Sequence, residues 1–135
     1  FQYMAKSPNI IVDVAHNPAG IEQLIQLVNK EIKSGQLHII YGASSDKNVK
    51  DIIPLFPNDS LLSFCEFSTD RTMKIENFKQ ISSLFNLNLN FYKTIQEAFT
   101  SIYNTVNKED TILITGSFFL ISDFFYFFPP KHLQK

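Results

Sequence analysis

The sequence predicts an α/β fold of three layers, with helices on both faces of a Rossmann-like, mostly parallel sheet of five or six strands. Two observations lead to this prediction. Short apolar runs rich in β-branched residues alternate along the chain with segments whose apolar residues recur at helical spacing, which is the pattern of βαβ units. The chain also has 135 residues, which is enough for one domain with a core of its own.

The first part of the chain contains two expected strands joined by a helix. Residues 10–15 (IIVDVA) are an apolar run that we expect to form a buried strand. Asn17 can cap the next helix, and Pro18 suits its first turn because the N–H that proline lacks would have no partner there. This helix should end near Gly35, and residues 37–43 (LHIIYGA) follow as the second strand.

The middle of the chain should add a short helix, a third strand and a longer helix. Residues 48–56 (NVKDIIPLF) are expected to form the short helix, which Pro54 and Pro57 stop. Residues 60–67 (SLLSFCEF) are the third strand, and residues 75–85 are the longer helix. The positions of that helix expected to face the core are Phe78, Ile81, Leu84 and Phe85.

The last part of the chain should complete the sheet. Residues 89–92 (LNFY) form a short strand, residues 94–106 (TIQEAFTSIYNTV) a helix, and residues 110–116 (DTILITG) the fifth strand. A final helix begins at Ser117. Ligands of open α/β sheets bind beyond the carboxyl ends of the strands, so a functional site is expected in the loops that follow them. These loops are residues 15–20, 42–47, 68–74 and 115–118.

The amino-acid composition argues against two classes of binding partner and favours one cellular location. Its 12 basic and 13 acidic residues give a net charge of −1, without the basic excess that drives binding to nucleic acid or to an anionic membrane. The one cysteine, Cys65, excludes an internal disulfide and favours a reducing, cytoplasmic location. No apolar run approaches the length of a membrane span.

Asp13 and His16 are the first candidate site residues. Asp13 lies inside an apolar strand, where a carboxylate needs a partner. It either binds the hydroxyl pair of a ligand such as a ribose or holds the backbone N–H groups of the next loop, and both readings stay open. His16 either contacts a phosphate or carboxylate or has a structural role; the adjacent helix N-terminus slightly favours an anion.

Three other loops hold further candidates. Gly116 would let a ligand approach the backbone, and the Ser117 hydroxyl would bind an anion, unless Ser117 is a plain helix cap. Lys47 lies in a polar loop that can equally be a capped helix start. Arg71 can clamp a carboxylate, although an isolated arginine is more often a solvated loop cation.

Several common sites are missing from the sequence. His38 and His132 have no third ligand near them in the pattern, so no zinc site is expected, and Cys65 should be a buried, unreactive thiol. The chain has neither a GxxxxGK[ST] phosphate loop nor a GxGxxG motif. The residues taken alone therefore predict an anion-binding α/β domain and no specific reaction.

Two motifs together resemble the C-terminal domain of the Mur ligase superfamily, and most closely its folylpolyglutamate synthase and dihydrofolate synthase branch. The first is VDVAHNPAG (residues 12–20), in which Val14 replaces the usual glycine. The second is ILITGSFFLISDF (residues 112–124). YGASSDKNVKDII (residues 41–53) and FSTDRT (residues 67–72) lie where relatives have a DKD-type loop and an arginine-containing loop, although Asn48 replaces the second acid of the former.

This resemblance implies an ATP-dependent ligase that adds L-glutamate to a pteroate or folate carboxylate through an acyl phosphate. Asp13 would hold the ATP ribose, and His16, Lys47 and Ser117 would face the glutamate and the transferred phosphate, with Arg71 as a further substrate contact. His16 and Ser117 are the expected catalytic residues. The phosphate loop, the ligands of Mg²⁺ and the pterin site would belong to an N-terminal domain.

Residues 1–135 are thus expected to be one domain, cut from a longer enzyme at the interdomain linker, because the chain starts at Phe1 without an initiator methionine. Such a domain should fold alone but not catalyse. Two rival hypotheses remain. One is the C-terminal domain of a peptidoglycan-precursor ligase, since that branch shares the DxAHNP loop. The other is a noncatalytic α/β module whose polar loops bind a partner protein.

Overall fold

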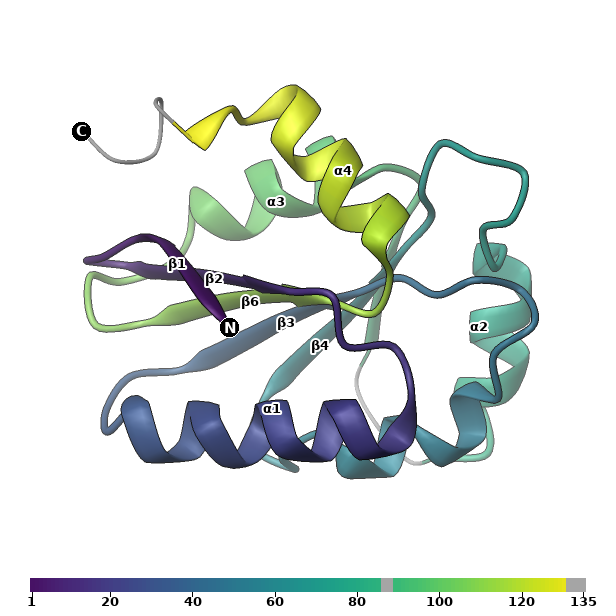
Figure 1. Ribbon diagram of the computed structural model, residues 1–135, viewed down its shortest axis with the longest axis horizontal. Helices are drawn as coiled ribbons and strands as arrows, with labels where there is room; N and C mark the ends of the chain where they lie inside the picture. Colours follow the sequence, from purple (N-terminus) through teal and green to yellow (C-terminus); the bar gives the residue numbers. More distant parts are fainter. Residues whose placement is uncertain (86–88, 131–135) are drawn as a thin grey trace.

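Six strands form one sheet in the computed structural model, which describes residues 1–85 and 89–130 (Figure 1). The strands are β1 (Gln2–Ala5), β2 (Asn9–Asp13), β3 (Leu37–Tyr41), β4 (Leu61–Cys65), β5 (Leu89–Tyr92) and β6 (Thr111–Thr115). Their order across the sheet is β1-β2-β6-β3-β4-β5. Strand β1 is antiparallel to β2 and all other neighbours are parallel, so the predicted mostly parallel sheet is confirmed.

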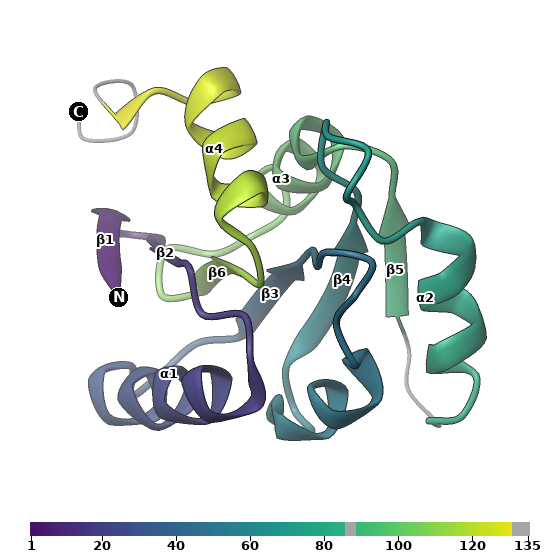
Figure 2. The same ribbon diagram turned by 45° about the vertical axis from the view of Figure 1, so that its right-hand side comes forward.

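Helices cover both faces of the sheet, as the sequence predicts (Figures 1 and 2). They are α1 (Pro18–Glu31), the 3₁₀ turns η1 (Val49–Asp51) and η2 (Ile53–Leu55), α2 (Ile75–Ser82), α3 (Ile95–Tyr103) and α4 (Phe118–Phe127). Helices α1 and α2 and the 3₁₀ turns pack on one face, and α3 and α4 pack on the other. Figure 2 shows the two helical layers on opposite sides of the twisted strands.

The consecutive apolar residues of the strands supply both cores. Successive side chains of a strand point to opposite faces of a sheet. Ile11 and Leu113 accordingly pack against α1 and its neighbours, whereas Ile10 and Ile112 pack against α3 and α4. All four side chains are fully buried. Burial of an isoleucine or leucine side chain contributes about 1.5–3 kcal/mol, so both layers are held by the same strands.

Several expected elements differ in the structure. Residues 48–56 form two short 3₁₀ helices in place of one continuous helix, because Pro54 lacks the N–H that a continuous helix needs. Helix α2 ends at Ser82, before the expected end at residue 85, and Leu84 is 66% exposed instead of facing the core. Helix α3 ends at Tyr103, although Val106 beyond it still packs on the core. The sequence pattern does not predict β1, the strand at one edge of the sheet.

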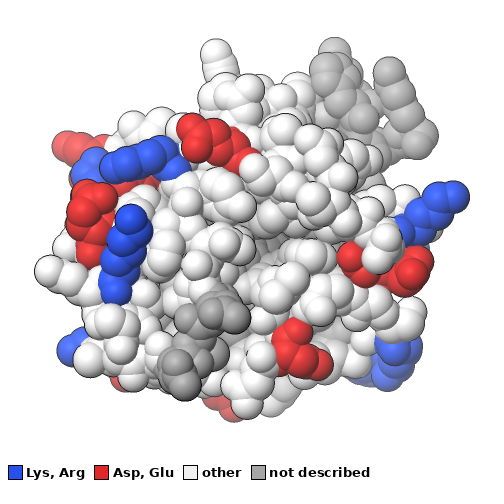
Figure 3. Space-filling model, turned by 180° about the vertical axis from the view of Figure 1, so that it is seen from behind, with Lys and Arg blue, Asp and Glu red and all other residues white. Residues whose placement is uncertain are grey.

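On the face seen in Figure 3, acidic and basic residues are interspersed and lie mainly toward the margins. Within residues 1–85 and 89–130, no helix combines the length and the apolar character needed to cross a membrane.

A buried carboxylate joins two loops at the edge of the sheet where the parallel strands begin. Asp110 accepts hydrogen bonds from the backbone N–H groups of Gln36 and Asn107, each at 3.0 Å, and lies 3.3 Å from Nε2 of His38. Burial alone would raise the pKa of the Asp110 carboxyl, but these hydrogen bonds and the neighbouring His38 outweigh burial and hold its pKa below the usual value. His38 is thus a structural partner of Asp110, and His132 lies outside the described residues.

Replacing Asp110 with asparagine should lower the free energy of unfolding by about 1–3 kcal/mol at pH 7, because the charged acceptor of two backbone N–H groups is lost. The pKa of Asp110 is lowered on folding, so its contribution is fully present above the unfolded pKa of about 3.9 and disappears as the pH falls through the native pKa. Urea denaturation across this pH range measures the effect. The exposed Asp70→Asn variant is the control, and a deficit in Asp110→Asn that stays constant into acid would contradict the assignment.

Candidate functional site

The carboxyl ends of three adjacent strands lie in one row. Asp13 of β2 is in register with Thr115 of β6, which is in register with Tyr41 of β3. After β2 the chain turns to α1 on one face, and after β6 it turns to α4 on the opposite face (Figure 1). When the loops after neighbouring strands turn to opposite faces, a crevice forms beyond the carboxyl ends of these strands. Open α/β sheets bind their ligands in this crevice.

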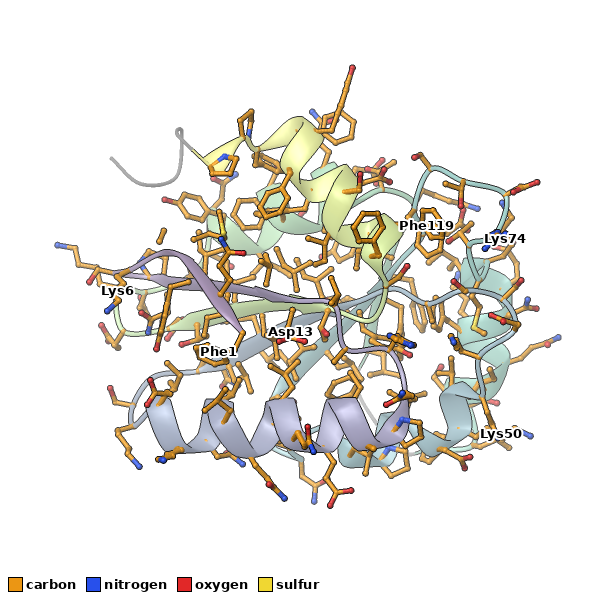
Figure 4. The ribbon with its side chains drawn as sticks, in the orientation of Figure 1. Phe1, Lys6, Asp13, Lys50, Lys74 and Phe119 are labelled. Atoms are coloured by element: carbon orange, nitrogen blue, oxygen red, sulfur yellow. The ribbon has the colours of Figure 1, made fainter. Side chains whose placement is uncertain are left out.

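Asp13 lies at the carboxyl end of β2 and lines two hollows there. One carboxylate oxygen accepts a hydrogen bond of 2.8 Å from the backbone N–H of Ala15, and the other faces the amino group of Phe1 (Figure 4). The side chain is 19% exposed, so ligands can reach it. The structure therefore shows the loop-holding role of Asp13, and the contact with a ribose stays a prediction.

The loop after Asp13 is fixed at three points. Asn17 caps α1 by accepting a 2.8 Å hydrogen bond from the Gly20 N–H, and Thr115 Oγ1 donates to the Ala15 carbonyl at 3.3 Å. His16 is exposed, with Nδ1 lying 3.2 Å from the carbonyl oxygen of Val14. If Nδ1 carries the proton and donates to that carbonyl, Nε2 is left as a hydrogen-bond acceptor.

Gly116 is required by a close approach of two loops. Its φ is +118°, and a Cβ there would lie 2.2 Å from the carbonyl oxygen of Gly42 and 2.7 Å from the Tyr41 ring. Burial raises the pKa of the Tyr41 phenol, whose hydroxyl has no hydrogen-bond partner among the described residues. The next residue, Ser117, is buried and caps α4, accepting from the Phe119 N–H at 3.0 Å. The cap role of Ser117 is thus observed, and its contact with a ligand remains a prediction.

Lys47 and Arg71 belong to two loops that the structure joins. Ser44 forms an isolated antiparallel bridge with Thr72, and the Ser45 N–H donates to the Arg71 carbonyl at 2.8 Å. Lys47 is half-buried and Arg71 is exposed. Neither side chain forms an ion pair with an acid in the part of the chain that the structure describes.

Two hollows meet at Asp13, each of about 380 Å³. The first lies beside α1 and includes His16, Asn17 and Gln23 in its lining. The second lies between β2 and α4 and is mostly apolar, with Phe118 among its lining residues. Among residues 1–85 and 89–130, no group of three or more histidine, cysteine and acidic side chains is arranged to hold a metal ion.

The structure adds residues that the sequence did not single out. Glu66 is buried beyond β4, and its Oε2 accepts from the Ile75 N–H at the start of α2 at 2.9 Å and lies 3.4 Å from Lys93 Nζ. Asp123 of α4 accepts two hydrogen bonds from Ser68. The only signal for either is a charged residue inside an apolar run. Cys65 is buried as predicted, and burial raises the pKa of its thiol.

Comparison with known proteins establishes the family. The model of the family described as Mur ligase, glutamate ligase domain, matches residues 1–118. The chain belongs to this family. The resemblance to the folate branch is also confirmed by the names of its relatives. One is a dihydrofolate synthase/folylpolyglutamate synthase of Buchnera aphidicola subsp. Schizaphis graminum, 31% identical over 125 residues, which are 92% of this chain and 29% of the relative. Another, from Buchnera aphidicola subsp. Acyrthosiphon pisum, is 33% identical over 92% of this chain and 30% of its own length.

Solved structures show the same fold. Escherichia coli FolC in complex with ADP aligns with a TM-score of 0.85 and 22% identity over 97% of this chain and 31% of that one. A bifunctional folylpolyglutamate synthase/dihydrofolate synthase of Yersinia pestis with Mn, AMPPNP and L-glutamate bound aligns with a TM-score of 0.82 and 18% identity, covering 93% of this chain and 30% of that one. The chain thus spans under a third of these proteins, and the alignments bear on the fold of this part alone.

Changing Gly116 to alanine should lower the free energy of unfolding by about 3 kcal/mol, because the new methyl group would clash with Gly42 and Tyr41 at an unfavourable φ. Urea denaturation of the chain measures this. Gly20→Ala is the matched control: its nearest neighbour would be Asn17 Oδ1 at 3.1 Å, and alanine is up to about 1 kcal/mol better than glycine inside a helix. Equal stability of the two variants would show that the approach at Gly116 is not tight.

Proposed function

We propose that this chain is the C-terminal domain of an ATP-dependent ligase that joins L-glutamate to dihydropteroate, to a folate, or to both. The observation that carries the proposal is the row of strand ends at the crevice, where Asp13, His16 and Ser117 lie on loops held by β2 and β6. Family membership and the printed names of the relatives support the same reaction.

In the proposed reaction, a carboxylate oxygen of the acceptor attacks the γ-phosphorus of ATP, and ADP leaves. The amino group of glutamate then attacks the carbonyl carbon of the acyl phosphate, inorganic phosphate leaves, and the nitrogen loses a proton as the amide forms. In both steps the reacting molecules carry negatively charged phosphate and carboxylate groups. The starts of α1 and α4 at the crevice favour anions because the N-terminus of a helix carries a partial positive charge.

The proposed roles follow from position and chemistry. Asp13 binds the ribose hydroxyls of ATP, since only one of its carboxylate oxygens accepts from the loop backbone and the other, which faces the Phe1 amino group, belongs to a side chain that is 19% exposed. His16 offers an imidazole to the glutamate amine, and the Ser117 hydroxyl donates to an oxyanion while its oxygen caps α4. Lys47 and Arg71 supply positive charge for the glutamate carboxylates or the transferred phosphate.

The remaining parts would come from an N-terminal domain of the same protein. The sequence of this chain has no phosphate-binding loop, and its described residues offer no metal-binding cluster. We therefore propose that the N-terminal domain holds the triphosphate, the Mg²⁺ ion and the pterin. Two neighbours support the use of these ligands: one is E. coli FolC with DHPP and ADP, the other the Y. pestis enzyme with Mn, AMPPNP and L-glutamate.

The decisive experiment is glutamate-dependent ADP release by the full-length protein that carries this domain. Dihydropteroate, a reduced folate and a muramyl nucleotide would each be offered as acceptor. Release with either pterin supports the proposal and shows which addition the enzyme performs. Release with the muramyl nucleotide alone would assign the domain to the peptidoglycan branch, and no release with any acceptor would favour a noncatalytic module.

In the full-length protein, Asp13→Asn should raise KM for ATP about tenfold or more, because a hydrogen bond to a charged group contributes roughly 1.5–3 kcal/mol. Asparagine still has an oxygen that can accept from the Ala15 N–H, so the loop should keep its shape. Asp59→Asn, at the opposite edge of the sheet, is the matched control. An unchanged KM for ATP in Asp13→Asn would remove the ribose role.

The chain of residues 1–135 by itself should release no ADP in the same assay, because its sequence has no phosphate loop and its described residues offer no metal-binding cluster. Circular dichroism and a cooperative urea transition would show that the chain is folded in that assay. Glutamate-dependent turnover by this chain alone would contradict the proposed division of the enzyme into two domains.

A further inference from the structure

Helix α4 reaches from the crevice to the loop that follows β4. Ser117 caps its start at the crevice, and Phe119 and Asp123 lie four residues apart, one turn of helix, on the same side. Both contact the segment from Phe67 to Arg71. Figures 1 and 2 both show this segment beside the first turns of α4, and Figure 4 labels Phe119 there.

Asp123 holds the beginning of this loop. One carboxylate oxygen accepts from the Ser68 backbone N–H at 2.7 Å, and the other accepts from Ser68 Oγ at 2.8 Å. Hydrogen bonds to an ionised carboxylate are shorter and stronger than those between neutral groups. Because two bonds go to one residue, they fix both the position and the orientation of the loop where it leaves β4.

Phe119 supports the side of the loop that carries Arg71. The Phe119 ring stacks on Phe67, with ring centroids 5.5 Å apart and an interplanar angle of 27°. The guanidinium carbon of Arg71 lies 5.9 Å from the centroid of the Phe119 ring. This distance is within the roughly 6 Å range of a cation–π contact, which orients the cation without neutralising its charge.

The other side of the loop is held by the loop after β3. The Arg71 carbonyl accepts from the Ser45 N–H at 2.8 Å, and the Met73 N–H donates to the Ala43 carbonyl at 2.7 Å. The backbone of Arg71 is therefore held by the loop after β3 and its guanidinium lies over the Phe119 ring, while among the described residues no carboxylate pairs with this guanidinium. The positive charge of this guanidinium can therefore pair with an anion of a bound ligand.

We infer that Asp123 and Phe119 are positioning residues that hold Arg71 at a fixed place relative to Ser117, so that the guanidinium binds an oxyanion of a substrate. This inference rests on the proposed function. The anion is either a carboxylate of the incoming glutamate or the transferred phosphate, because the fork of an arginine matches both in a bidentate contact. Asp123 and Phe119 do not touch the substrate and act only through Arg71.

The test is a double-mutant cycle in the full-length protein, with kcat and the KM values for glutamate and ATP measured in the presence of a pterin acceptor. Arg71→Ala should lower kcat/KM for glutamate on the order of tenfold, the change expected for about 1.4 kcal/mol. A rise in KM for glutamate would identify the carboxylate as the anion, and a fall in kcat with both KM values unchanged would identify the transferred phosphate. Asp123→Ala should reproduce the direction of the Arg71→Ala effect, at about three- to tenfold.

The cycle separates a positioning role from general stability. Asp123→Ala should add nothing in the Arg71→Ala background, because its effect passes through Arg71. Asp123→Asn, which keeps an acceptor for the Ser68 N–H, should recover most of the activity, and Ser68→Ala should be intermediate. Tyr126→Phe, a change at an exposed side chain of the same helix, is the matched control and should leave all constants unchanged.

Additive effects of Asp123→Ala and Arg71→Ala would overturn the inference and leave the proposed function standing. Unchanged constants in Asp123→Ala in an active enzyme would do the same. If Asp123→Ala fails to fold, Ser68→Ala, which removes one of the two hydrogen bonds, makes the same cycle with Arg71→Ala. A wild-type protein that is inactive with every acceptor would instead overturn the proposed function, and the role of Arg71 with it.

Discussion

The insertion of β6 between β2 and β3 is the constraint on which the site depends. All five residues from Thr111 to Thr115 are buried, and they pair in register with both neighbouring strands. Because the three strands are parallel, their carboxyl ends are level. Asp13, Thr115 and Tyr41 consequently lie side by side, and Gly116 must leave the sheet between the Tyr41 ring and the Gly42 carbonyl.

This arrangement explains why one short region can hold so many polar groups. The chain leaves β2 and β6 toward opposite faces, so the N-termini of α1 and α4 approach the same crevice from two sides. Asn17 and Ser117 each satisfy one early N–H group of the helix they cap. Phosphate and carboxylate groups are attracted by the partial positive charge of a helix N-terminus. In this fold the backbone of α1 and α4 supplies that charge.

The loops at the crevice also stabilise one another. The loop after β3 pairs with the loop after β4, and α4 holds the latter through Asp123 and through the Phe119 ring. Three elements that are distant in the sequence thus form one connected support. In the proposed function, this support holds the charged side chains in place for the reacting groups of the ligase, which must meet with correct geometry.

The sequence by itself determined the strands of the parallel sheet, the helices capped by Asn17 and Ser117, and the end of the sheet at which we propose the site. Apolar runs buried on both faces, helical periodicity and capping residues are local signals, and local signals survive in a single sequence. The same signals predict that Asp13, His16 and Ser117 lie at one end of the sheet, because the carboxyl ends of parallel strands meet there.

Only the tertiary structure decided the strand order, the edge strand β1, the exposure of Leu84 and the 3₁₀ geometry around Pro54. It also decided that an oxygen of Asp13 accepts from the Ala15 N–H, and that Asp123 holds Ser68 although the two are 55 residues apart in the sequence. These features depend on which segments pack together. A contact between two distant segments produces no periodic pattern in the sequence of either one.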